Sequence, residues 1–598
     1  MSDQAERSAE PAGASSPPLP GPLAVRGQLG DGAAVALAVA ASLGAWWHRP
    51  LPLAIGVGLA VTGVLVRRSA VLVVAVFVLA GTLGARAYAG LAPLGARPFQ
   101  GTVTLVADPA TTPFGATADA RVDGHRVEVE ASGAAAGALG ASLAGEVLLV
   151  TGHLGPPPPH SPWLVPRHVA GRLTVTTAER SGGGAAPWRA ANRFRRLLSN
   201  GAAVMPEPER SLYGGFVLGD DRNQAPEIVD DFRGSGLTHV LVVSGQNVAY
   251  VLVLVAPVLR RLSWRGRWLL TIAVIGAFAV VTRFEPSVLR ASAMAAIAVT
   301  AGAVGRPVGA VRTLALAVAG LVLIDPLLVR SVGFQLSVGA SLAIAVLAQP
   351  IARLLPGPRL LAEAVGVTLA AQVGVAPVLI PRAGGLPVVS VVANPLAVPV
   401  AGVVTTWGLP AGVVAGIGGP AVARIVHLPT QVMIGWVAAV ARIGASLPLG
   451  TIGWPHLAVL VAAALVAARV PRLRVGAGVV AVVALLAPAL VLRSPPPSES
   501  LGHGAVVHRG GGATVVVLPS RAQPGGVLQD LRGAGVRRID LLLIDGGDVA
   551  GLARSVRHRW PVGRVLDART TAPVRLRLGS LTIDVVPPGP PEVVAEPP

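Results

Sequence analysis

The feature that most constrains this sequence is a series of apolar runs, each close to the length that crosses a bilayer. We count about thirteen, because a span needs about 20 predominantly apolar residues; they lie in residues 31–95 and 236–493. Only 13% of the 598 residues are charged and 52% are hydrophobic, whereas soluble domains are about 25% charged. The sequence therefore predicts a polytopic α-helical membrane protein.

Arginine supplies all the positive side-chain charge, because the sequence contains no lysine, and the formal net charge is +19. Arginines such as Arg67 and Arg68 recur in alternate loops, which predicts a cytoplasmic N-terminus and places residues 96–182 and 494–598 outside. Single arginines break the pattern at Arg330, Arg382 and Arg442. A polyanionic partner is compatible with the net charge, but coding bias together with the positive-inside rule explains that charge equally well.

The ends of the chain and its missing residue types narrow the possibilities further. Residues 1–30 are polar and rich in Pro, Ala and Ser, which predicts disorder, and they lack the pattern of a cleaved signal peptide. The sequence has no cysteine, so disulfides, thiolate metal sites and a cysteine nucleophile are excluded. A phosphate-binding loop of the P-loop type is excluded by the absence of lysine.

Two regions have the patterns of folded domains outside the membrane. Residues 96–182 contain short β-prone segments and the hairpin signal Asp123-Gly124, which predict a small β-barrel of the OB-like kind. In residues 183–235, the segment Pro187–Ala203 is amphipathic, with Arg189, Asn192, Arg193 and Arg196 on its polar face. It favours an interfacial helix on the membrane, with packing on the β-domain as the alternative. Residues 494–598 alternate strands and helices, which predicts a small α/β domain.

Polar residues inside the apolar runs are the candidate functional residues. Four of them, His239, Ser244, Gln246 and Asn247, cluster in the stretch Phe232–Leu254. We expect a Gly-broken helix over Leu237–Leu254, with His239, Tyr250 and either Gln246 or Asn247 near one face, and a break at Asn394-Pro395 in a later helix. Polar groups at membrane depth are costly and commonly face a cavity, a partner helix or a substrate. Hydrogen bonding between packed helices is the alternative for each residue alone. We predict that the cluster lines a path through the membrane, together with Arg290, Gln335, Gln372 and Asn394.

An ordered set of motifs along the chain resembles the ComEC competence family. The motifs are Leu218-Gly219-Asp220, Gly236–Gly245, Ser287–Ala291, Asp325-Pro326, Gly333–Ser337, Ala371-Gln372 and Ala393–Pro395. The resemblance implies a multi-pass channel of the cytoplasmic membrane that takes up single-stranded transforming DNA during natural competence. It implies single-stranded DNA, membrane lipid and other competence proteins, including a separate motor, as partners, and a homo-oligomer is compatible with it. A small-solute transporter or a membrane scaffold on the same core is the alternative.

The sequence departs from the family pattern in two places. Asn247 stands where the family has a second histidine, so a proton-linked role there is in doubt, because Asn does not titrate near neutrality. In many members the C-terminal domain resembles a metallo-β-lactamase with an H-x-H-x-D-H motif, but the matching stretch Ile539–Leu552 has only Asp545 and Asp548 near its turn. Two carboxylates do not make a two-metal nuclease site. We therefore expect a degenerate domain with no metal, no cofactor and no enzymatic activity; an outer-face nuclease is the less favoured alternative.

Overall fold

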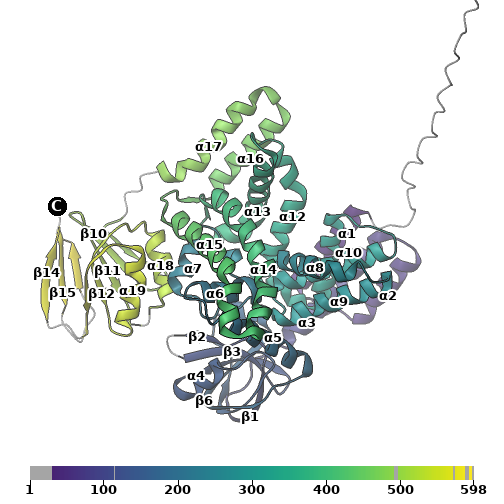
Figure 1. Ribbon diagram of the computed structural model, residues 1–598, viewed down its shortest axis with the longest axis horizontal. Coiled ribbons are helices and arrows are strands. Elements are labelled where there is room, and N and C mark those ends of the chain that lie inside the picture. The colour runs from purple at the N-terminus through teal and green to yellow at the C-terminus, as the bar shows by residue number, and fades with distance from the viewer. Residues whose placement is uncertain are drawn as a thin grey trace, which may run out of the picture.

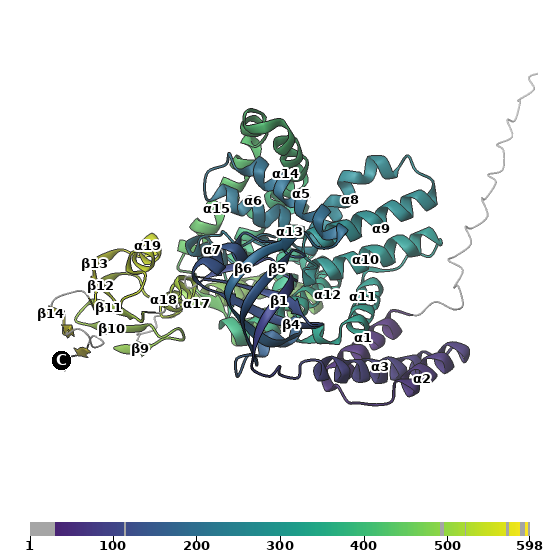
Figure 2. The same cartoon turned by 90° about the horizontal axis from the view of Figure 1, so that it is seen from below.

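The computed structural model describes residues 30–112, 115–490, 496–520, 522–569, 573–585 and 592–595. The predicted disorder of residues 1–30 falls almost entirely on residues 1–29, which lie outside the described residues. A helical core occupies the middle of the molecule, a β-domain packs against the core, and a second domain with β-sheets lies to one side (Figure 1). In both views the C-terminal domain and the N-terminal helices α1–α3 lie at opposite ends (Figure 2).

Most of the described chain is helical, as the apolar runs predict. Eight stretches are long and apolar enough to cross a membrane: α3 (Ser69–Ala89), α9 (Trp264–Val281), α10 (Pro286–Ala303), α12 (Val332–Ala352), α13 (Arg359–Ala383), α14 (Ser390–Val426), α15 (Leu428–Ser446) and Pro471–Ala489, which includes most of α17 (Arg474–Leu490). Five apolar helices are shorter: α1 (Asp31–Trp47), α2 (Leu53–Leu65), α8 (Gly245–Leu259), α11 (Ala310–Ile324) and α16 (Trp454–Arg469). The number of helices that span the membrane stays a prediction.

Many large apolar side chains of these helices point away from the protein. Ile324 of α11 and Val475 of α17 are 82% and 81% exposed, and similar residues recur along most of the other helices. Exposed apolar surface on this scale is unusual for a soluble protein. Lipid is the environment that removes it from water, which agrees with a membrane-embedded core.

Two helix boundaries differ from the sequence prediction. The helix predicted from Leu237 begins only at Gly245; before it, Thr238–Val240 forms a separate 3-10 turn, η3. His239 therefore does not share a helical face with Gln246. A break was also expected at Asn394-Pro395, but α14 continues through these residues, and its backbone leaves helical geometry at Gly419, where φ is 78°.

The β-domain is a ring of strands. Its elements are β1 (Arg97–Leu105), β2 (Ala110–Thr112), β3 (Gly115–Val122), β4 (His125–Ala131), α4 (Gly133–Gly140), β5 (Val147–Gly155), η1 (Pro162–Arg167) and β6 (Val169–Gly182). Neighbours follow the order β1-β5-β6-β4-β3, and β3 also pairs with β1, which closes the ring. The β4–β6 pair is parallel and the other pairs are antiparallel. Alternate side chains, such as Val103 and Leu148, fill the interior of this ring.

A connector joins the β-domain to the membrane core. It comprises α5 (Ala186–Ala202), α6 (Glu209–Tyr213), the π-helical turn η2 (Gly214–Leu218) and α7 (Pro226–Gly234). α5 packs against α9 and α14. Gly412 and Gly416 of α14 permit this close approach, because a Cβ at Gly416 would lie 2.4 Å from the carbonyl oxygen of Leu197. Asn192, predicted on the water-facing side of this helix, is buried.

The C-terminal domain has two sheets with helices on one outer face. The larger sheet has the order β13-β12-β11-β10-β9, and the smaller has the order β14-β15-β16. The elements are β9 (Ser498–Ser500), β10 (Val506–Gly510), β11 (Ala513–Leu518), α18 (Pro524–Gly533), β12 (Ile539–Ile544), α19 (Val549–Arg559), β13 (Val562–Asp567), β14 (Val574–Leu578), β15 (Leu581–Val585) and β16 (Glu592–Ala595). Strand β12 is apolar on both faces: Leu542 packs toward the helices and Leu543 toward the smaller sheet.

Candidate functional site

A large cavity begins in the membrane core and reaches the C-terminal domain. Its volume is about 2880 Å³, several times the roughly 300–1,000 Å³ of a pocket for a small molecule. The walls come from the first halves of α8, α10, α12 and α14, from the length of α13, and from loops and helices of the C-terminal domain. Such a space can hold an extended chain of several units.

The cavity follows α13 from one end to the other. Its wall includes Leu360 in the first turn of this 25-residue helix and Ala383 at its last residue. A helix of this length measures about 37 Å at 1.5 Å per residue, which exceeds the roughly 30 Å of a bilayer's hydrocarbon core. The cavity is therefore as long as a path across a membrane has to be.

Seven of the eight predicted path residues line this cavity, and one does not. The seven are His239, Ser244, Gln246, Asn247, Arg290, Gln372 and Asn394. Gln335 is the exception, since it lies outside the lining and its Nε2 donates to the carbonyl oxygen of Val329 at 2.7 Å. This hydrogen bond connects the start of α12 to the preceding 3-10 turn, Pro326–Arg330.

The residues at the start of α8 divide between packing and lining. Asn247 is buried; its Nδ2 donates to the carbonyl oxygen of Phe216 at 3.1 Å, and its Oδ1 accepts from the Ser244 hydroxyl at 3.3 Å. These bonds hold α8 against η2 and need only a neutral donor, which Asn supplies. The Gln246 amide donates to the Tyr250 hydroxyl on the cavity wall.

Further polar groups lie where α13 and α14 meet. The Gln372 amide donates to the Ser390 hydroxyl, which donates in turn to the carbonyl oxygen of Pro387 at 2.6 Å. The Asn394 Oδ1 is buried and has no hydrogen-bond partner among the described residues. This wall therefore contains a buried acceptor that no hydrogen bond among the described residues satisfies.

Arg290 lies in the cavity wall near the start of α10. Its Nε donates to the Ser337 hydroxyl at 2.8 Å and its Nη1 contacts the Met294 sulfur at 3.0 Å. The sequence left three alternatives for this side chain: pairing with Glu285, snorkelling, or contact with phosphate. The pair with Glu285 is not formed in the structure. Its Nη2 lies against Gly245, where a Cβ would come within 2.7 Å.

The mouth of the cavity at the C-terminal domain is rich in arginine. The arginines in its lining are Arg233, Arg509, Arg532, Arg537, Arg538 and Arg559. Two of them attach the domain to α7: Arg532 pairs with Asp230, and Arg559 pairs with Asp231 at 3.3 Å. Burial raises the pKa of Asp230 and of Asp231 above the ordinary value, because the nearby arginines offset it only in part.

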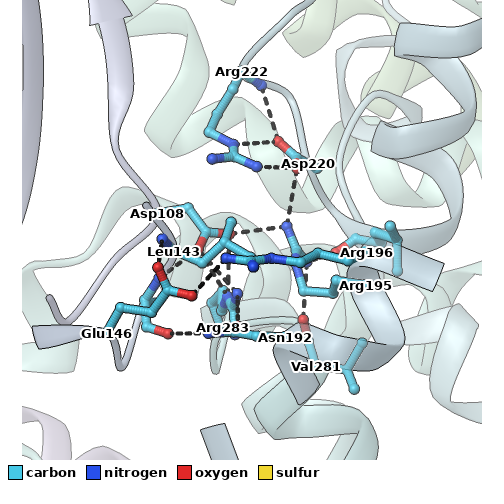
Figure 3. Close-up of polar contacts among 12 residues, drawn as sticks. Asp108, Leu143, Glu146, Asn192, Arg195, Arg196, Asp220, Arg222, Val281 and Arg283 are labelled. Atoms are coloured by element: carbon cyan, nitrogen blue, oxygen red, sulfur yellow. Dashed lines mark hydrogen bonds and ion pairs between the residues drawn. The ribbon is translucent and has the colours of Figure 1, made fainter. Parts of the chain in front are cut away.

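A second polar cluster joins the β-domain to the core (Figure 3). Arg195 of α5 is buried, and its Nη2 pairs with Asp108 at 2.9 Å and with Asp220 at 3.1 Å. Arg283 also pairs with Asp108, at 3.0 Å, and Arg222 pairs with Asp220 at 2.6 Å. Burial raises the pKa of Asp108, but the charges of Arg195 and Arg283 outweigh it, and the pKa lies below the ordinary value. For Asp220, Arg222 and Arg195 outweigh burial in the same way.

Sequence reasoning did not identify this second cluster. Asp220 belongs to one of the recognised motifs, and its partner Arg222 is two residues away, but its other partner Arg195 also pairs with Asp108, which lies far away in the chain. The available signal was an arginine, Arg195, between the polar and apolar faces of the amphipathic segment. Such a position on a helix that packs on two sides is buried, and a buried arginine requires carboxylates.

The two carboxylates expected in the degenerate domain have structural partners. Asp545 pairs with Arg569 at 2.9 Å, and Asp548 caps α19 by accepting from the Gly551 N–H at 2.9 Å. Within the ranges that the structure describes, three or more His, Asp or Glu side chains do not gather anywhere into a possible metal site.

Comparisons with known proteins identify the membrane core. Residues 216–474 match the family model described as Competence protein. The chain is similar to "Uncharacterized protein YcaI" of Escherichia coli (strain K12), with 26% identity over 241 residues, which cover 38% of this chain and 32% of that protein. It is also similar to "ComE operon protein 3" of Bacillus subtilis (strain 168), with 24% identity over 225 residues, which cover 37% of this chain and 28% of that protein.

These matches cover only part of each protein, and the family match lies in the membrane core. The chain spans about a third of the length of the curated relatives it matches, and no solved structure matches it. The family match covers most of the cavity-lining helices, and the long apolar helices mark a multi-pass membrane protein. Residues 216–474 therefore match the competence protein family, and the resemblance to ComEC proteins is confirmed.

Proposed function

We propose that the protein is a channel of the cytoplasmic membrane that passes a single strand of DNA during natural competence. The observation that carries the proposal is the single cavity that extends along all of α13 and opens among arginines of the C-terminal domain. A competence role is what the family name indicates, and the cavity supplies a route. Because the chain has no lysine, it lacks a P-loop, so a separate motor protein would drive the strand.

The composition of the route suits a nucleic acid strand. Arginines at the mouth attract phosphates, and binding releases counterions from the strand. Tyr250 lies along the wall and offers an aromatic face for an unpaired base. A small-solute transporter would need neither this volume nor an arginine-rich mouth, so both features favour the DNA channel over that alternative.

The two extramembrane domains fit supporting roles in this proposal. Strand order β1-β5-β6-β4-β3, ring closure and α4 between β4 and β5 support an OB-like barrel for residues 96–182. The two sheets of the C-terminal domain, with helices on one outer face, support a degenerate metallo-β-lactamase-like fold. Its arginines at the cavity mouth favour guiding DNA rather than cutting it.

Electrical recording from the purified full chain in a planar bilayer tests the proposal, because an applied voltage can replace the motor. Single-stranded dT oligomers should block the current for times that depend on voltage, and blunt duplexes of the same length should not enter. A matched control is the bilayer without protein. Absence of any strand-dependent block in bilayers that demonstrably contain conducting protein would contradict the proposal.

A further inference from the structure

We propose that Arg290 and the first turn of α8 form a binding site for one phosphate group of the transported strand, inside the cavity. The inference rests on the proposed function for the identity of its ligand. The site itself rests on three observations: a buried guanidinium without a carboxylate, a helix start that faces it, and a glycine that lets the two meet.

The first observation is the uncompensated charge of Arg290. Only 8% of the surface of Arg290 is exposed. Its contacts are the neutral hydroxyl of Ser337 and the thioether of Met294. Among the residues that the structure describes, no ion pair includes it. A buried charge is costly unless an opposite charge accompanies it. Arg195, which is buried to a similar extent, has two carboxylate partners.

The second observation is the start of α8. This 15-residue helix begins at Gly245, and the side chain of its N-cap residue Ser244 makes no capping hydrogen bond. The first N–H groups of a helix have no partner within the helix, and the helix dipole makes this end positive. The Asn247 N–H donates to the Ser244 carbonyl oxygen at 3.1 Å, whereas those of Gly245 and Gln246 have no partner among the described residues. Groups of this kind bind phosphate in many proteins.

The third observation brings these two positive groups together. A Cβ on Gly245 would lie 2.7 Å from the Arg290 Nη2, 2.9 Å from the Ala291 Cβ and 3.1 Å from the Ser287 carbonyl oxygen. Only glycine therefore allows the guanidinium to lie directly against the helix start. Two positive groups repel each other unless an anion lies between or beside them, and both border the cavity.

A phosphodiester is the anion that fits this arrangement. Its oxygens accept paired hydrogen bonds from a planar guanidinium and single bonds from backbone N–H groups. Because the site lies in the cavity wall beyond the arginine-rich mouth, a strand that passes the mouth arginines would meet Arg290 inside the membrane core. A single phosphate contact binds the strand weakly enough for the strand to dissociate from it and move on.

The test measures how salt weakens binding of a fluorescent dT oligomer to the purified full chain in nanodiscs. Each phosphate contact to a single strand contributes about 0.7 to the slope of log affinity against log salt. Arg290→Gln should reduce the slope by that amount and weaken binding, while Arg290→Lys should retain the slope. The control is Arg382→Gln, at a position outside the cavity lining, which should leave the slope unchanged.

An uncharged peptide nucleic acid of the same sequence separates phosphate binding from a structural role. Its affinity should not respond to Arg290→Gln. An unchanged salt slope in Arg290→Gln, or an equal loss of affinity for the peptide nucleic acid, would overturn the inference while leaving the channel proposal intact.

Two further arms distinguish the other outcomes. If the unsubstituted chain binds no oligomer, the channel proposal fails. The site is then tested by measuring the melting temperature with and without inorganic phosphate. Phosphate should raise the melting temperature of the unsubstituted chain but not that of Arg290→Gln. If anionic phosphatidylglycerol in the nanodisc gives that Arg290-dependent stabilisation in place of the oligomer, the occupant is a lipid headgroup and the inference is wrong.

Discussion

Two junctions attach extramembrane domains to the membrane core, and both consist of arginines paired with aspartates. They differ in whether the arginines or the burial has the larger effect on the pKa values of the aspartates. At the β-domain junction, arginines outweigh burial, so the pKa values of Asp108 and Asp220 are lowered. At the C-terminal junction, burial outweighs the arginines, so the pKa values of Asp230 and Asp231 are raised. An ion pair that lowers the pKa of its carboxylate stabilises the contact at neutral pH, whereas a raised pKa marks a contact that costs free energy to keep ionised.

The hydrogen bonds at the two junctions agree with this difference. Asp108 accepts from Arg195, Arg283 and the Ala144 N–H. Asp230 leaves its Oδ1 buried and unpaired among the described residues, and Arg532 leaves its Nε in the same state. Arg283 also has one unpaired nitrogen, so the difference lies in the carboxylates. We infer that the β-domain is fixed to the core and that the C-terminal domain can separate from it.

Removing the central arginine of the β-domain junction should have the largest effect. Arg195→Leu leaves Asp108 and Asp220 buried with less positive charge, and losing one partner of a buried pair costs about 3–5 kcal/mol. Denaturant unfolding of the purified full chain in detergent measures this loss. Arg193→Leu, at an exposed position on the same helix, is the control and should change stability little. A loss below about 1 kcal/mol in Arg195→Leu would contradict the assignment of this junction as the fixed one.

Breaking the C-terminal junction should have a smaller and more local effect. Arg532→Ala removes the partner of Asp230, so α18 should separate from α7 and its amides should exchange hydrogen faster, while β1 to β6 keep their protection. Hydrogen exchange followed by mass spectrometry measures both regions at once. Arg538→Ala serves as the control, because that exposed side chain pairs with Asp540 within the domain. Equal loss of protection in the β-domain would show that the two junctions are not independent.

The pH dependence of the two junctions should have opposite signs. Asp230 and Asp231 have raised pKa values when docked, so protonation favours docking: their contribution is full below the ordinary pKa of about 3.9 and is lost as pH rises through the raised values. Asp108 and Asp220 have lowered pKa values, so their contribution is full above that pH and is lost as pH falls through the lowered values.

Hydrogen exchange in α18 and in α5, corrected for the intrinsic effect of pH, follows each junction separately. Asp230→Asn combined with Asp231→Asn should remove the pH dependence in α18 and leave that in α5. The same sign of pH dependence in both helices would refute the contrast between the junctions.

The smallest effect is expected at the two carboxylates left in the degenerate domain. Asp548→Ala removes the cap of α19 and should cost about 1 kcal/mol of domain stability, the usual value for an N-cap. The full chain should not cleave single-stranded DNA with Mg²⁺ or Mn²⁺, with or without this substitution. Metal-dependent cleavage that disappears in Asp545→Ala or Asp548→Ala would instead establish the nuclease alternative.

Sequence patterns predicted the parts of this fold that depend on local hydrophobicity. The apolar runs coincide with the helices, and the period of two in segments such as His125–Ala131 coincides with β-strands. The start of α8 was placed too early because the residues before Gly245 are as apolar as the helix itself. Only the turn at Thr238–Val240 separates them, and apolar composition does not reveal a turn.

The candidate site was predicted in part, for a physical reason. Polar residues at membrane depth are costly, and most of the predicted ones, including His239 and Gln372, line the large cavity. Gln335 lies outside the lining and donates to a nearby carbonyl group, and Asn247, although in the lining, does the same; a sequence does not distinguish such packing from lining. The Arg195 cluster was missed because two of its members come from distant parts of the chain. Asp108 lies in a loop of the β-domain and Arg283 in a loop between membrane helices.

Cross-linking from a stalled strand tests the central claim most directly, because the chain has no cysteine of its own. A dT strand carrying thiol-reactive groups and blocked at one end by streptavidin is driven by voltage or by the motor into chains with single cysteines. Ser341→Cys and Thr368→Cys lie in the cavity wall. Exposed Leu342→Cys, which follows Ser341, and exposed Leu361→Cys, on the same helix as Thr368, lie outside that wall. The account predicts cross-links at the first pair and none at the second; cross-links at the outer pair alone, or at no position in a chain that takes up the strand, would contradict it.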